Sequence, residues 1–218
     1  MAIAINGSGT VTGISVGGLP DGIVDSGTLA TNSVDSAELI DGAIDASHLN
    51  TTSTGINSSA NAVAITISSD EEVTMPKQPC FLASNSGVQT NVTGNGATHT
   101  MVWGTETFDQ NADFDGTTFT APVTGRYLIS ASLHFQQLTA AADQVQLGIV
   151  TSNKAFTSVI YHVNGWGSEP ETHKTVLCDM DAADTFTITC RIAGESSDIV
   201  DVTAGANGYT YVSCALIA

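Results

Sequence analysis

The feature that most constrains the fold is an alternation of apolar and polar residues in the C-terminal part of the chain. Residues 127–136 read Tyr-Leu-Ile-Ser-Ala-Ser-Leu-His-Phe-Gln, and the odd-numbered side chains form one apolar series. This period of two places alternate side chains on opposite faces of a β-strand, and no stretch has the 3.6-residue period of a long amphipathic helix. Many short, half-buried strands in one region predict a sandwich, jelly roll or barrel. Further runs of this kind occupy residues 145–149, 176–180, 186–192 and 212–216.

Composition separates a thin N-terminal part from a globular C-terminal part. Residues 1–76 hold nine acidic residues and no basic one, whereas both Trp, all four Tyr and all seven Phe come after Lys77. Large aromatic side chains dominate packed cores, so we place the main boundary near Met75–Lys77. The predicted segments are an anchor peptide (1–19), a repeat stem (20–55), a β neck (56–76) and an all-β head (77–218).

The predicted stem contains three copies of a ten-residue repeat, PDGIVDSGTL, ATNSVDSAEL and IDGAIDASHL, which together span residues 20–49. Each copy supplies only two large apolar side chains, so one copy cannot bury itself, whereas copies from three chains stacked around an axis can. The alternative is a flexible acidic linker whose register is accidental. The predicted trimeric stem core consists of Val24, Leu29, Val34, Leu39, Ile44 and Leu49.

Charge and motif content exclude several classes of function. The chain has 22 acidic and five basic residues, a net charge of −17, which argues against nucleic acid and anionic membrane surfaces as partners. No apolar run is long enough for membrane insertion, and the N-terminus does not resemble a secretory signal. The sequence has no nucleophile elbow, phosphate loop or dinucleotide fingerprint, so we predict a non-enzymatic protein without cofactors.

The cysteines and one acidic loop have simple interpretations. Cys178, Cys190 and Cys214 lie on the apolar phase of their strands and are predicted to be buried, reduced thiols. Residues 111–116, Asn-Ala-Asp-Phe-Asp-Gly, resemble the start of a calcium loop, but Pro122 stands where such a loop needs its bidentate Glu. We therefore predict a polar turn without a bound metal. The alternative is a nonstandard calcium site, whose ligands would be Asn111, Asp113 and Asp115.

Binding is the more natural role for the loops of the head. Trp166, Glu169 and Asn207 lie in two predicted loops, 164–170 and 194–208, and form the candidate receptor-facing site. Loops on a rigid scaffold often carry recognition, and Trp offers a large contact area. The alternative for Trp166 is packing beneath its own loop or at a trimer interface.

Two segments of the head resemble a known family. Residues 119–128 (FTAPVTGRYL) resemble a hallmark strand pair of complement-type globular heads, which share the TNF-like jelly roll. Residues 177–186 (LCDMDAADTF) resemble the later hairpin of that family, in which an acidic turn joins two core strands. The usual Phe-Ser-Gly near the C-terminus is absent. The resemblance covers residues 77–218 and implies a TNF-like jelly-roll sandwich that forms homotrimers.

The N-terminal third is similar to short fibre and spike proteins of tailed bacteriophages. The similarity is carried by INGSGTVTGISVGGLPDG, by the repeats and by ITISSDEEVTMPKQPCF. It implies a virion-surface protein that is assembled in the host cytoplasm and held by another virion protein through its N-terminus. The expected function is attachment through a trimeric head to a host cell-surface glycan or protein.

Two other functions remain open at this point. One is a capsid-attached head fibre or decoration protein that stabilises the shell. The other is a tailspike depolymerase, although the chain lacks the long parallel β-helix expected of that class.

Overall fold

The computed structural model describes residues 63–161 and 168–218, which form three antiparallel sheets and one short 3-10 turn, η1 (Gly205–Asn207). The smallest sheet is a hairpin of β1 (Thr66–Ile67) and β2 (Val73–Thr74). A five-stranded sheet comprises β5 (Thr98–Thr100), β7 (Thr118–Thr120), β9 (Gln144–Thr151), β10 (Ala155–Tyr161) and β12 (Thr185–Ala193). A seven-stranded sheet comprises β3 (Cys80–Ser84), β4 (Gln89–Thr93), β6 (Thr105–Asp109), β8 (Gly125–Gln136), β11 (Glu171–Met180), β13 (Val200–Val202) and β14 (Tyr211–Leu216).

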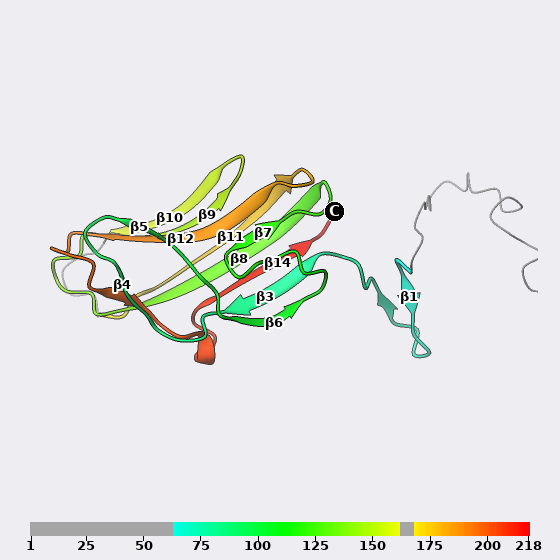
Figure 1. Ribbon diagram of the computed structural model, residues 1–218, viewed down its shortest axis with the longest axis horizontal. Helices are drawn as coiled ribbons and strands as arrows, with labels where there is room; N and C mark the ends of the chain where they lie inside the picture. Colours follow the sequence, from blue (N-terminus) through cyan, green and yellow to red (C-terminus); the bar gives the residue numbers. More distant parts are fainter. Residues whose placement is uncertain (1–62, 162–167) are drawn as a thin grey trace, which may run out of the picture. The chain divides into compact units, whose positions relative to one another are not determined.

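The two large sheets lie face to face and enclose one hydrophobic core (Figure 1). The five-stranded sheet has the order β10-β9-β12-β5, with β7 also paired to β12. In the other sheet the long β8 pairs with β11 on one edge and with β14 and β13 on the other. Among the described residues, no helix is long and apolar enough to span a membrane.

The aromatic side chains form the centre of the core. Phe119 on β7 lies 5.6 Å from Phe81 and 5.2 Å from Phe186, measured between ring centroids. Tyr127 meets Phe119 edge-on at 5.5 Å, and its hydroxyl donates a hydrogen bond to the carbonyl of Val123 at 2.7 Å. The FTAPVTGRYL segment therefore connects two strands whose aromatic residues meet across the core.

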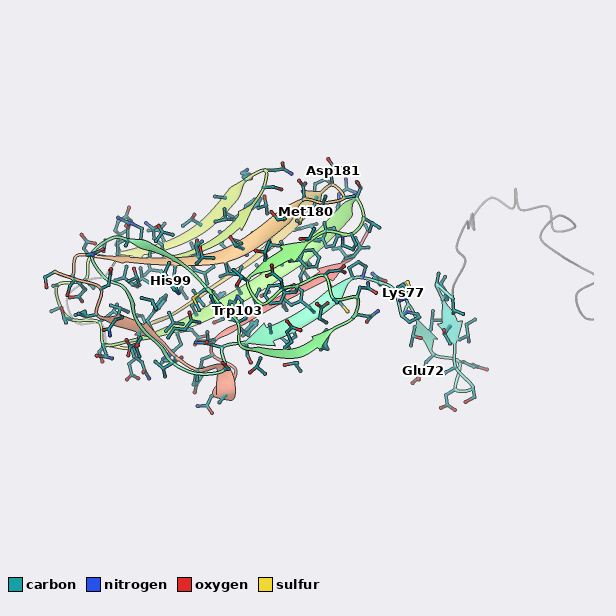
Figure 2. The ribbon with its side chains drawn as sticks, in the orientation of Figure 1. Glu72, Lys77, His99, Trp103, Met180 and Asp181 are labelled. Carbon is teal, nitrogen blue, oxygen red and sulfur yellow. The ribbon has the colours of Figure 1, made fainter. Side chains whose placement is uncertain are left out.

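The predicted hairpin at residues 177–186 is wrong, because β11 and β12 belong to different sheets. A hairpin would have paired Cys178 near residue 187, but Cys178 pairs with Tyr127 of β8. The turn after Met180 is closed by a 2.9 Å hydrogen bond from the Asp184 amide to the Asp181 carbonyl, and Met180 and Asp181 are labelled there in Figure 2. Crossing between sheets lets both strands turn their apolar faces to one core. Such crossing connections define a jelly roll, so the predicted fold class is confirmed.

Residues 194–208, predicted as one long loop, also contain a strand. Within them β13 pairs with β4 and β8. The corner before it needs a glycine, since Gly194 has a φ of 101° and an added Cβ would lie 2.3 Å from the Ala141 carbonyl oxygen. The neighbouring Glu195 is buried, and its carboxylate accepts hydrogen bonds from the amide and hydroxyl of Thr139 at 2.7 and 2.8 Å.

All four cysteines are free, and Cys178, Cys190 and Cys214 are buried as predicted. Burial raises the pKa of the Cys190 thiol from 9.0 to about 12, and the pKa values of Cys178 and Cys214 also rise, chiefly through burial. At pH 8 these groups are therefore neutral thiols, whereas the thiolate is the reactive form.

We accordingly expect Ellman's reagent at pH 8 to modify at most one thiol per folded chain within minutes, namely the partly exposed Cys80. All four thiols should react once the chain is unfolded in guanidinium chloride, which removes the burial. Rapid modification of two or more thiols in the folded protein would contradict this assignment.

Candidate functional site

The outer face of the seven-stranded sheet carries two rows of side chains without a single charge. In the first row Leu177 lies opposite Leu128, and Leu128 lies opposite Ala215, which in turn pairs with Cys80. The second row contains Thr175, Ser130, Ser213, Leu82 and Phe108. Leu128, Leu177 and Phe108 are 42%, 53% and 48% exposed. We call Leu82, Phe108, Leu128, Leu177 and Ala215 the outer patch.

The corresponding face of the five-stranded sheet is polar along β12. Its β12 presents Thr185, Thr187, Thr189 and Arg191 on the side away from the core. A chain with a net charge of −17 thus leaves two adjacent rows of the seven-stranded sheet's outer face uncharged and partly apolar, between the pair of Arg126 and Asp179 on one side and Glu171 on the other. Such a surface loses little on desolvation and gains from burial, which suits association with another protein surface.

The outer patch is not evident from the sequence, although one signal for it is present. Leu128 stands on the polar phase of its strand, in a series otherwise made of Arg, Ser, His and Gln. Leu177 likewise falls between the core-facing Val176 and Cys178. A large aliphatic residue on the solvent phase of a strand is the pattern that indicates a second apolar face, but only strand pairing places Leu128 beside Leu177.

Two predicted recognition residues, Glu169 and Asn207, line the same hollow near the C-terminal end of β8. Its volume is about 310 Å³. The ring of His134 packs on that of Tyr209 at a centroid distance of 5.3 Å, and both residues also line the hollow. We call this feature the end hollow; its other lining residues are Val88, Gln136, Thr203, Ala204 and Ala206.

Hydrogen bonds hold the walls of the end hollow in place. The carbonyls of Ser168 and Pro170, on either side of Glu169, accept from the amides of Leu138 and Phe135 at 3.2 and 2.9 Å. The turn that carries Asn207 is closed by a 2.9 Å bond from the Gly208 amide to the Gly205 carbonyl. Both exposed side chains therefore project from backbone that is fixed by hydrogen bonds.

The calcium candidate has another explanation in the structure. The Asp115 carboxylate accepts hydrogen bonds from the amides of Thr117 and Thr118 at 2.9 and 2.7 Å, as in a polar turn. The side-chain amide of Asn111 donates a hydrogen bond to the backbone carbonyl of Lys77 at 3.0 Å. Burial, followed by the neighbouring charge of Asp109, raises the pKa of Asp113. In the described part of the chain, no group of three or more His, Cys, Asp or Glu side chains is arranged to hold a metal ion.

Two further predictions lie outside the described residues. These are the stem core of Val24, Leu29, Val34, Leu39, Ile44 and Leu49, and the loop residue Trp166. Both stay predictions from the sequence.

Comparison with known proteins gives structural likenesses only. No family model and no curated protein matches the chain. The globular domain of zebrafish complement 1qA protein aligns with a TM-score of 0.45 and 12% identity, over 65% of this chain and 98% of the other. Murine APRIL at pH 8.5 aligns with a TM-score of 0.45 and 9% identity, over 65% of this chain and all of the other.

Proposed function

We propose that this protein is a non-enzymatic fibre or spike on the surface of a tailed bacteriophage, in which three copies assemble and display their jelly-roll heads for attachment to the host. The outer patch carries the proposal, because exposed Leu and Phe side chains in two uncharged rows of a sheet favour contact with another protein surface. Other copies of the same chain are available wherever the protein is made, so they are the natural partner for this patch. Closed symmetric rings are common among homo-oligomers.

The hairpin of β1 and β2 supports self-assembly independently. Ile67 pairs with Val73, and by the alternation of the strands Ile65 and Met75 share their face. All four side chains are exposed. A two-stranded hairpin is marginal alone, so its apolar face is expected to be covered by the hairpins of the other two copies. The decapeptide repeats, with two large apolar groups each, have the same requirement.

The remaining parts of the proposal follow from the sequence. The N-terminal residues 1–19 would bind another virion protein, the repeats would form the stem, and assembly would take place in the host cytoplasm. The head would carry recognition, because its loops project from a rigid scaffold. A decoration protein of the capsid shares the trimeric architecture and differs in making no contact with the host.

Adsorption measurements test the attachment role. Excess full-length protein should slow adsorption of the phage that carries it to host cells, since free trimers would occupy the receptors first. The same protein unfolded by heat should have no effect, and immunogold labelling should place the protein on the tail. Labelling on the capsid together with unchanged adsorption would favour the decoration protein.

A further inference from the structure

We infer that the end hollow binds one uncharged sugar ring of a surface polysaccharide, a ligand class that rests on the proposed attachment function and makes it specific. The inference starts from the side chains that the fold brings together at this place. Glu169 and Asn207 are far apart in the sequence, and β8 and the connection before β14 bring them to one hollow with Tyr209. The three residues offer a carboxylate, a primary amide and an aromatic ring.

The charge of the lining selects against acidic ligands. None of the described residues that line the hollow is a Lys or Arg, and Glu169 contributes a negative charge. A phosphate, sulfate or uronic acid would have no cationic partner there and would be repelled by the carboxylate. The ligand is therefore not acidic, and a sugar hydroxyl can donate a hydrogen bond to the carboxylate of Glu169.

The polar groups match a ring that carries several hydroxyls. The carboxylate of Glu169 accepts two or more hydrogen bonds, while the amides of Asn207 and Gln136 each donate and accept. Adjacent hydroxyls of a pyranose both donate and accept, so one ring can satisfy this mixed set. A purely apolar ligand would leave all three polar groups without partners, which costs free energy.

Tyr209 supplies an apolar contact for the C–H face of the sugar. Tyr209 is 46% exposed, although its ring packs on that of His134. Small residues, Ala204 and Ala206, complete the lining without filling it. The volume of about 310 Å³ is at the lower end of the usual range for small-molecule sites, which fits one ring rather than a long oligosaccharide.

One such site is expected to bind a sugar with low affinity, whereas a trimer would bind a polymer through three sites at once. Three copies of the hollow on one particle can engage neighbouring units of a repetitive polymer, and the second and third contacts then form at high effective concentration. A polysaccharide with neutral repeating units is therefore the matching host structure.

Saturation-transfer NMR on the full-length protein tests the inference, with methyl glucoside, methyl galactoside, N-acetylglucosamine and glucuronate as probes. At least one neutral sugar should receive saturation, and glucuronate should receive little. Tyr209→Ala and Glu169→Gln should each weaken the affinity about tenfold, the loss expected when one main contact is removed. The matched controls are Tyr161→Ala, at an exposed Tyr on β10, and Glu106→Gln, at an exposed Glu on β6.

The outcomes separate this inference from the proposed function. Absence of transfer to every neutral probe, preference for glucuronate, or equal losses in the control variants would overturn the sugar site. If the protein is trimeric and slows adsorption in those cases, the attachment function stands with a different ligand. If neutral sugars bind through Tyr209 but adsorption is unaffected, the site stands and the attachment function fails.

Discussion

Replacing Leu128 and Leu177 together with glutamate should weaken association of the proposed trimer about a thousandfold, while the head stays folded. The two residues lie opposite each other on β8 and β11 in the outer patch. Each fully buried Leu contributes about 1.5–3 kcal/mol, and an unpaired carboxylate in its place adds a desolvation penalty of several kcal/mol. A loss of even about 4 kcal/mol per interface corresponds to roughly a thousandfold weaker association. Mass photometry and sedimentation velocity measure the change directly.

The matched control for this variant is Val159→Glu. Val159 is 41% exposed, close to the 42% of Leu128, but it lies on β10 at the edge of the other sheet. It should leave the trimer intact, and near-ultraviolet circular dichroism should show native packing in both variants. A double-glutamate variant that associates as tightly as the wild type would mean that the outer patch is not part of the assembly surface. A wild-type protein that is already monomeric would remove the trimer from the proposal altogether.

Replacing Phe119 with alanine should destabilise the head more than a substitution on its surface. The ring is 1% exposed and contacts three other aromatic residues at centroid distances between 5.2 and 5.6 Å. Truncating a buried Phe costs about 3–5 kcal/mol, from lost transfer free energy and the cavity that remains. Guanidinium unfolding, followed by tryptophan fluorescence at a fixed chain concentration, should show this loss in the free energy of unfolding.

Tyr161→Ala provides the comparison for Phe119→Ala. Tyr161 is 72% exposed at the end of β10, so its removal should change the free energy of unfolding by no more than about 0.5 kcal/mol. Fixing the chain concentration matters because unfolding of an oligomer depends on it. Equal effects of the two substitutions would show that the aromatic cluster does not hold the two sheets together.

Alternation alone identifies the core-facing residues of the long strands of the head. Ile129, Leu133, Leu147 and Ile188 are all buried, as the alternation predicts, because the side-chain period of a strand is two wherever the strand lies. It also indicated buried thiols, since Cys178, Cys190 and Cys214 share that apolar phase. The all-β class follows from these local patterns alone.

Strand pairing, and what the second face of each strand meets, depend on the complete fold. The acidic turn at residues 181–184 is compatible with a hairpin or with a crossing between sheets, and the local sequence does not distinguish them. The same is true of Leu128 and Leu177, and of Glu169 and Asn207, which become neighbours only through the order of strands. The physical reason is that alternation fixes the direction of each side chain, whereas pairing depends on how all the strands together bury their apolar faces in one core.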